Sequence, residues 1–146
     1  MRETGSMKDP SLRRILFVED DPDIQTVAKM ALEAIGGFHV LACGSGLEAL
    51  SRLGEFSPDL VLLDVMMPGM DGPATLAALR QIPDGRDLPV VFMTSRVQVQ
   101  EVAAYREMGA ADVIPKPFDP MALSEQVQSV WDSLKTRMDG ACHWGG

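Results

Sequence analysis

An unbroken apolar run at Leu60–Leu63 leads directly into a single carboxylate at Asp64. A continuous run of this kind, bounded by turn residues, is typical of a strand that is buried on both faces of a parallel sheet. A Pro-Gly pair at residues 68–69 and an Asp-Gly pair at residues 71–72 then predict turns. Ligands of open parallel sheets bind beyond the carboxyl ends of the strands. Asp64 is therefore a candidate nucleophile or metal ligand, unless it only caps the following turn.

Strand-like segments alternate with segments of helical apolar spacing along most of the chain. The predicted strands cover residues 13–18, 38–42, 60–63, 88–93 and 111–114. The predicted helices begin near residues 22, 46, 72, 99 and 119, and Gly54 is expected to end the second of them. Strands that alternate with helices indicate parallel βαβ units with right-handed crossovers. We therefore expect an α/β, doubly wound (βα)5 fold with a five-stranded parallel sheet of order 2-1-3-4-5.

The length of 146 residues is enough for one domain with a substantial core. We expect this domain to cover residues 11–137. Residues 1–10 include a Gly-Ser-Met that resembles a vector scar, so we expect a disordered segment that is partly vector-derived. The Gly-rich residues 138–146 are predicted to form a disordered tail.

Charge and composition exclude several classes of function. The net charge of −8 argues against direct binding of nucleic acid through a basic surface. No apolar run approaches the roughly 20 residues of a membrane span, and no secretory signal is found. Cys43 and Cys142 have neither metal-site spacing nor a disulfide pattern, which fits a reduced cytoplasmic protein.

Polar side chains follow four of the predicted strands. They are Glu19, Asp20 and Asp21 after the first strand, Asp64 after the third, Thr94 after the fourth and Lys116 after the fifth. Because parallel strands end at the same edge of a sheet, we expect these side chains to converge. Crowded carboxylates repel unless a cation joins them, and oxygen ligands favour Mg²⁺. A lysine and a hydroxyl can hold phosphoryl oxygens, so the set favours phosphoryl transfer to an Asp nucleophile.

The chain resembles the receiver domains of two-component response regulators over about residues 13–134. The matching stretches are residues 15–22, 63–72, 94–95 and 116–118. The resemblance implies a flavodoxin-like receiver fold. It also implies a freestanding, chemotaxis-regulator-like receiver, which is how we interpret the chain.

The resemblance implies a role for each acidic residue at the sheet edge. Asp64 matches the phospho-acceptor, and Asp20 matches the direct Mg²⁺ ligand. Glu19 matches the second acid of the metal site, and the backbone carbonyl of Met66 would complete its ligands. Asp21 is an alternative second acid, although the register of the preceding strand favours Glu19 and Asp20.

The other site residues also follow from the resemblance. Thr94 matches the switch hydroxyl and Lys116 the lysine that acts with the acceptor, with the Lys116–Pro117 peptide expected to be cis. Met66 and Arg96 occupy positions that tune the kinetics in this family. The Met66 side chain could shield a phosphoryl group from water, whereas Arg96 could contact that group or extend into solvent.

Val113 departs from the family pattern. The family usually carries Tyr or Phe three residues before the lysine, and this chain has Val113 there. Valine has no polar tip and is stiff at χ1. We therefore expect the signalling surface to change through backbone or loop shifts, or to respond weakly.

The predicted function is that of a phospho-accepting receiver in a two-component phosphorelay. A phosphohistidine on a sensor histidine kinase or histidine phosphotransfer protein donates to Asp64 with Mg²⁺, and the face of the fourth helix, fifth strand and fifth helix changes for a downstream effector protein. The chain then catalyses only its own phosphorylation and dephosphorylation and is not a turnover enzyme. We expect no direct nucleic-acid or membrane partner, and either a monomer or a phosphorylation-dependent dimer.

Two alternatives remain open from the sequence. The first is an interaction module with the same fold that signals without phosphorylation. Val113 favours this module, whereas Asp64, Thr94 and Lys116 argue against it. The second is a Mg²⁺-dependent phosphohydrolase with an Asp nucleophile, which would need an acid where the chain has Met66 and a cap segment for its substrate.

Overall fold

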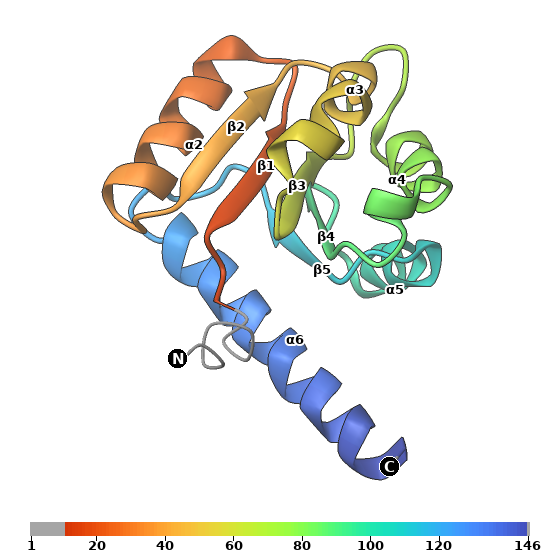
Figure 1. The fold of residues 1–146 in the computed structure, drawn as a ribbon. Helices are drawn as coiled ribbons and strands as arrows, with labels where there is room; N and C mark the ends of the chain where they lie inside the picture. Colours follow the sequence, from red (N-terminus) through yellow and green to blue (C-terminus); the bar gives the residue numbers. More distant parts are fainter. Residues whose placement is uncertain (1–10, 146) are drawn as a thin grey trace.

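The computed structural model of the chain describes the backbone of residues 11–145 and the side chains of residues 11–135. The strands of the described chain are β1 (Arg14–Val18), β2 (His39–Cys43), β3 (Leu60–Asp64), β4 (Val90–Thr94) and β5 (Asp112–Pro115). They form one parallel sheet in the order β2-β1-β3-β4-β5 (Figure 1). The predicted α/β fold and the predicted strand order are confirmed.

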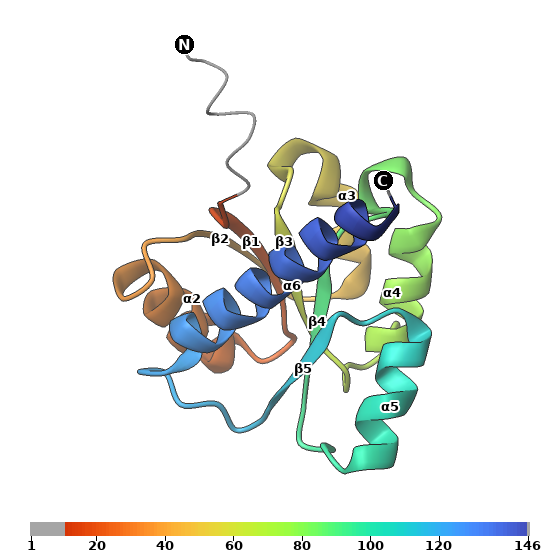
Figure 2. The same cartoon turned by 90° about the horizontal axis from the view of Figure 1, so that it is seen from below.

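Helices cover both faces of this sheet. They are α2 (Pro22–Ala34), α3 (Gly46–Phe56), α4 (Gly72–Arg80), α5 (Val99–Met108) and α6 (Leu123–Gly145), with a short 3₁₀ helix η1 (Pro83–Gly85) after α4. Figure 2 shows α2 and α6 on one side of the sheet and α3, α4 and α5 on the other. Within the described part of the chain, no helix is both long enough and apolar enough to cross a membrane.

Strand β3 is buried along its whole length because β1 and β4 flank it and helices cover both faces. Its side chains alternate between the two layers, as strand geometry requires. Leu60 and Leu62 pack in the core under α2 and α6, whereas Val61 and Leu63 pack in the core under α3, α4 and α5. The apolar run in the sequence is therefore the centre of the protein, and it ends at Asp64.

Side-chain caps begin two helices directly beside the carboxyl edge of the sheet. Asp21 accepts a hydrogen bond from the backbone N–H of Asp23 at 2.9 Å and caps α2. Asp71 accepts one from the backbone N–H of Ala74 at 2.9 Å and caps α4. Such caps satisfy backbone donors that the first helical turn leaves free. They hold the loops after β1 and β3 in defined positions.

The prediction that Gly54 ends the second helix is wrong. Helix α3 continues to Phe56, and Ser57 ends it in the left-handed region at φ 51°. Gly54 is exposed, so its cost in the helix is modest, whereas Phe56 is buried in the core. Burial of the aromatic ring explains why the helix extends past the glycine.

The last helix begins and ends later than the sequence pattern indicated. Asp119 accepts a hydrogen bond from Met121 N–H at 2.9 Å in a turn that precedes Leu123, the first residue of α6. The backbone of α6 then runs to Gly145, through most of the predicted disordered tail at residues 138–146 (Figure 1). Each residue added to an existing helix gains one backbone hydrogen bond. The Gly-rich composition of residues 138–146 does not reveal this gain. The predicted disordered segment at residues 1–10 lies outside the described residues.

Gly72 is required by close packing against the end of β3. A Cβ atom at Gly72 would lie 2.7 Å from Cα of Val65 and 2.8 Å from the carbonyl oxygen of Asp64. Both are backbone atoms, so relief of the clash would shift the segment that carries Asp64. We expect Gly72→Ala to lower the free energy of unfolding by about 1–3 kcal/mol, measured by urea denaturation.

Gly54→Ala is the matched control for this substitution. A Cβ atom there meets only the carboxylate oxygen Oδ2 of exposed Asp84, at 3.3 Å. Because alanine favours the helix interior, this variant is expected to keep the stability of the wild type or to gain up to about 1 kcal/mol. A Gly72→Ala protein as stable as the wild type would show that the close approach of residue 72 to the backbone of β3 does not require glycine.

Candidate functional site

Carboxylates from two neighbouring strands meet at the carboxyl edge of the sheet. Glu19 and Asp20 follow β1, and Asp64 ends β3, which pairs directly with β1. One carboxylate oxygen of each residue lies within 4.8 Å of the others. Glu19 and Asp64 are each only 2% exposed, whereas Asp20 is exposed to solvent. The structure therefore brings together the three acids that the sequence selected.

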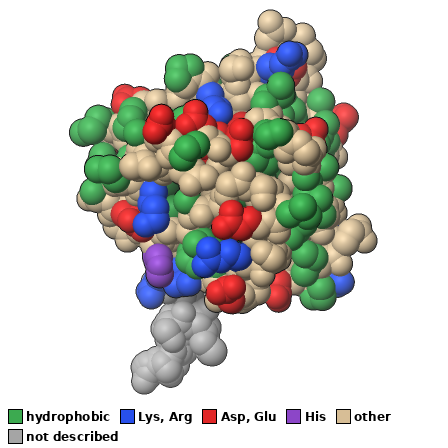
Figure 3. All heavy atoms as spheres, turned by 90° about the horizontal axis from the view of Figure 1, so that it is seen from above, with side chains coloured by type: hydrophobic (Ala, Val, Ile, Leu, Met, Phe, Trp, Pro, Cys, Tyr) green, Lys and Arg blue, Asp and Glu red, His purple; other side chains and the backbone are tan. Residues whose placement is uncertain are grey.

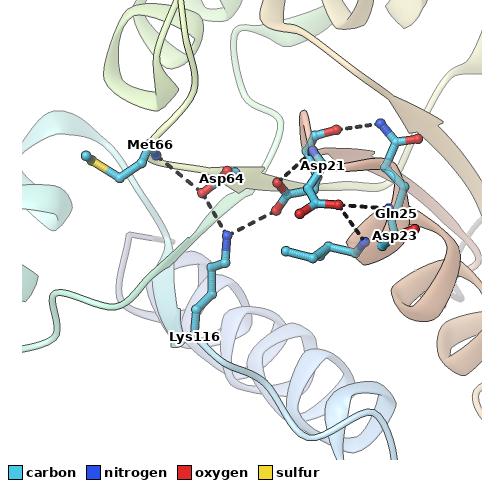
Figure 4. A network of polar contacts seen from close by, with 8 residues as sticks. Asp21, Asp23, Gln25, Asp64, Met66 and Lys116 are labelled. Atoms are coloured by element: carbon cyan, nitrogen blue, oxygen red, sulfur yellow. Dashed lines mark hydrogen bonds and ion pairs between the residues drawn. The ribbon is translucent and has the colours of Figure 1, made fainter.

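Lys116 joins two of these acids from the end of β5. Its Nζ atom lies 3.1 Å from Oε1 of Glu19 and 3.3 Å from Oδ1 of Asp64 (Figure 4). Burial lowers the pKa of Lys116, but the hydrogen bond and charge of Glu19 and the charge of Asp64 outweigh burial, and the net shift is upward. The Lys116–Pro117 peptide is cis, as predicted. Lys116 is therefore a charged ammonium group placed between two buried carboxylates.

Glu19 has a raised pKa in this cluster. Burial, with a smaller contribution from the Asp64 charge, raises the pKa of Glu19 to about 6, although the backbone N–H of Asp21 and the Lys116 ammonium oppose the shift. That N–H donates to Oε2 of Glu19 at 3.1 Å. Three carboxylates face one ammonium group, which leaves negative charge unbalanced. This all-oxygen donor set fits a hard divalent cation such as Mg²⁺.

Backbone and side-chain contacts fix the loop that carries Glu19. The backbone N–H of Glu19 donates to the carbonyl of Cys43 at 2.9 Å, which extends the pairing of β1 with β2. The Gln25 amide on α2 donates to the carbonyl of Glu19 (Figure 4). Asp21, the alternative second acid, uses its carboxylate to cap α2. Sequence reasoning missed Gln25 because a glutamine on a helix gives no signal of its own.

Met66 contacts the acceptor through its backbone. Its N–H donates to Oδ1 of Asp64 at 3.3 Å. The Met66 side chain is 63% exposed and points away from Asp64 in Figure 4. The structure thus places the Met66 backbone beside Asp64 and directs the sulfur elsewhere.

Thr94 and Arg96 interact with each other at the end of β4. The buried Thr94 hydroxyl oxygen accepts a hydrogen bond from the backbone N–H of Arg96 at 3.0 Å. The exposed Arg96 guanidinium lies 3.8 Å from the carboxylate of Glu101 on α5. Glu101 is a second residue that sequence reasoning missed, although its place in the first helical turn is typical of a capping residue.

Val113 lies beside an aromatic pair in the core. It pairs with Phe92 in the register of β4 and β5 and packs against the core under α3, α4 and α5. Tyr105 from α5 contacts the Phe92 ring edge-on, with centroids 5.3 Å apart. The aromatic side chains in this region therefore come from β4 and α5 and not from β5.

A mostly apolar groove opens beside the site. A pocket of about 450 Å³ is lined by Lys116, Asp23 and Ser95 together with apolar side chains of α2 and of the segment after β5. Figure 3 shows acidic side chains gathered across the upper part of one face, with hydrophobic and basic groups interspersed around them. On this face the basic side chains do not form a continuous patch (Figure 3).

The sheet order and this edge define a class of protein. Carboxylates from β1 and β3, a hydroxyl from β4 and a lysine from β5 at one edge of a 2-1-3-4-5 sheet are the parts of a flavodoxin-like receiver domain. The response regulator receiver domain family matches residues 15–128, and the chain belongs to that family. The protein is therefore the receiver domain of a two-component response regulator, and the resemblance found in the sequence is confirmed.

Relatives and solved structures agree with this assignment. The chain is 39% identical over 116 residues to the transcriptional regulatory protein CseB of Streptomyces coelicolor. The matched region covers 80% of this chain and 48% of CseB. It is 36% identical over 121 residues to the DNA-binding response regulator MtrA of Mycolicibacterium smegmatis. The matched region covers 83% of this chain and 51% of MtrA. The chain spans about half the length of the curated relatives it matches.

Two solved structures show the same fold. Chemotaxis protein CheY4 of Vibrio cholerae superposes with a TM-score of 0.75 at 26% identity, covering 82% of this chain and 99% of that one. The N-terminal domain of a response regulator receiver protein from Methanoculleus marisnigri superposes with a TM-score of 0.67 at 39% identity, covering 82% of this chain and 97% of that one.

Proposed function

We propose that the chain accepts a phosphoryl group on Asp64 in a Mg²⁺-dependent reaction. The observation that supports this most is the surroundings of Oδ1 of Asp64, which the Lys116 ammonium and the Met66 N–H contact, each at 3.3 Å, next to two further carboxylates. A buried carboxylate held in this way can attack phosphorus as a nucleophile. The donor is a phosphohistidine on a sensor histidine kinase or a histidine phosphotransfer protein. The Asp64 oxygen bonds to phosphorus while the bond from phosphorus to the histidine nitrogen breaks.

The other residues of the edge hold the reactants. Glu19, Asp20 and Asp64, with the backbone carbonyl of Met66, would hold Mg²⁺. When bound, Mg²⁺ neutralises charge on the transferred phosphoryl oxygens. Lys116 would supply a second positive charge, since its Nζ atom lies 3.3 Å from Oδ1 of Asp64. The chain would catalyse only its own phosphorylation and dephosphorylation.

The proposed output is a change in the surface formed by α5, β5 and α6, which are the fourth helix, the fifth strand and the fifth helix of the fold. Phosphorylation adds negative charge and acceptor oxygens beside Thr94, whose hydroxyl now contacts the loop to α5. Reorientation of Thr94 toward these oxygens would move that loop, with Met66 and Arg96 tuning the lifetime of the phosphoryl group. Since Val113 replaces the usual aromatic residue, backbone and loop shifts carry the change to an effector protein.

The proposed setting is the cytoplasm, with proteins as direct partners. The apolar groove beside Lys116 gives a donor protein a surface adjacent to Asp64. We assign residues 11–137 to the domain, as a monomer or a phosphorylation-dependent dimer, with neither membrane nor nucleic acid as a direct partner. A receiver-fold module that signals without phosphorylation is the second candidate, and Val113 is the observation that favours it.

A direct test uses a small phosphodonor. The protein is incubated with Mg²⁺ and acetyl phosphate, and its intact mass is recorded. We expect one added phosphate, lost when a chelator removes Mg²⁺. No uptake by a folded protein that binds Mg²⁺, with acetyl phosphate and with a phosphohistidine donor, would favour the module.

A further inference from the structure

Glu101 in the first turn of α5 serves two partners with its two carboxylate oxygens. Oε1 accepts a hydrogen bond from the backbone N–H of Gln98 at 3.1 Å, as part of the capping box that begins the helix. Oε2 lies 3.8 Å from a guanidinium nitrogen of Arg96. The charge of Arg96 is therefore held on the N-terminus of α5.

Arg96 also has a link to the phosphorylation edge. Its backbone N–H donates to the Thr94 hydroxyl oxygen at 3.0 Å. Thr94 directly follows Met93, which pairs with Asp64 in the register of β3 and β4. Arg96 is the one charged residue in the sequence between Thr94 and α5. Arg96 thus contacts the edge of the sheet through its backbone N–H and the helix that follows through its guanidinium group.

The contact between Arg96 and Glu101 is suited to exchange. The two side chains are 65% and 28% exposed, and exposed ion pairs of this kind are weak. An added phosphoryl group carries about −1.5 to −2 charges at neutral pH, more than one carboxylate. A cation is also disfavoured near a helix N-terminus, where the helix dipole is positive. Each of these effects favours transfer of the guanidinium to the phosphoryl oxygens.

Helix α5 is lightly anchored, so a change at its first turn can move it. Tyr105 is the one buried residue among those of α5, and it packs on Phe92 in the second half of the helix. The first turn is held by the capping box of Gln98 and Glu101. Segments with few buried contacts open and shift at low cost.

We propose that Glu101 is a positioning residue that retains Arg96 on α5 until Asp64 is phosphorylated, when Arg96 exchanges Glu101 for the phosphoryl group. This inference rests on the proposed function of Asp64. It gives the chain a charge-based link between Asp64 and α5. Such a link does not need an aromatic side chain on β5, where this chain has Val113.

The test measures the rate of phosphorylation by acetyl phosphate in Glu101→Gln. Glutamine keeps an oxygen that accepts the Gln98 N–H, so the cap is retained while the charge that holds Arg96 is lost. A released Arg96 can attract the anionic donor. We expect the rate to rise by about two- to fivefold, the range that an exposed ion pair imposes on an equilibrium. In an Arg96→Ala background, Glu101→Gln is expected to leave the rate unchanged.

Glu48→Gln is the matched control, because Glu48 has the same chemistry on another helix. Its Oε1 accepts the Gly44 N–H at 2.7 Å, and its Oε2 lies 3.8 Å from a guanidinium nitrogen of Arg52. Loss of this charge on α3 is expected to leave the phosphorylation rate unchanged.

The outcomes separate the inference from the function on which it rests. An effect of Glu101→Gln that is equal with and without Arg96 would assign Glu101 to capping alone and overturn the inference. Phosphate uptake at the same rate by the wild type and by each variant would also overturn it, and would leave the proposed function intact. A wild type that takes no phosphate would remove the proposed function and the inference together.

Discussion

Asp64→Asn is expected to abolish phosphate uptake from acetyl phosphate while the protein stays folded. Asparagine has nearly the same shape as aspartate but lacks the anionic oxygen that attacks phosphorus. Asp64 is buried and its charge raises the pKa of Glu19, so removal of this charge relieves repulsion in the cluster. We therefore expect the metal-free variant to be at least as stable as the wild type, which separates loss of chemistry from loss of fold.

Asp71→Asn is the control for this experiment. Asp71 is an exposed cap of α4, and asparagine caps helices about as well as aspartate. Its intact mass is expected to show the same single phosphate as the wild type. Phosphate uptake by Asp64→Asn at the rate of the wild type would place the acceptor at another residue and refute the proposed site.

Lys116→Met is expected to cause the largest loss of stability among the site variants. Without the ammonium group, Glu19 and Asp64 remain as two nearly buried carboxylates with no cation between them. Removing one partner of a buried ion pair typically costs about 3–5 kcal/mol. Because Lys116 is 21% exposed and a carboxylate can take up a proton, we expect a loss of about 2–3 kcal/mol in the free energy of unfolding.

The pH dependence of this loss follows from the pKa of Glu19. An acid whose pKa is raised on folding contributes stability below its unfolded pKa, and this contribution disappears as pH rises through its folded pKa. The folded pKa of Glu19 is about 6, against an ordinary value of 4.5, and Lys116 lowers it. The folded pKa should therefore rise further in Lys116→Met. The difference in stability between variant and wild type is expected to widen as pH rises above about 6, the folded pKa of Glu19 in the wild type.

Urea denaturation in chelator across this pH range measures the effect. Lys29→Met is the matched control, since Lys29 also forms an ion pair at 3.2 Å, with Glu33, but on an exposed helix surface. That variant is expected to lose less than about 0.5 kcal/mol, with little dependence on pH. We also expect Mg²⁺ to restore stability to Lys116→Met but not to Lys29→Met. Equal losses of unfolding free energy in the two variants would show that Lys116 does not stabilise the buried carboxylates more than an exposed ion pair would.

The sequence predicted the fold well where the signals were local and repeated. The apolar run at Leu60–Leu63 and the alternation of strands and helices follow from periodicities that each segment carries in itself. The caps by Asp21 and Asp71 are equally local, because each side chain contacts a backbone N–H only two or three positions away. Element ends were less accurate, as at Gly54, because burial of Phe56 outweighed the local preference for a break.

The sequence by itself determined the class of the protein and the residues at the carboxyl edge of its sheet, since parallel strands must end together. Only the tertiary structure decided how these side chains pair. Lys116 reaches Glu19 and Asp64 across separations of 97 and 52 residues, and the Gln25 amide reaches the carbonyl of Glu19 from α2. The contact of Glu101 with Arg96 likewise depends on the path of the loop before α5. Such contacts depend on the closure of the whole sheet and on side-chain rotamers, which no local pattern in the sequence encodes.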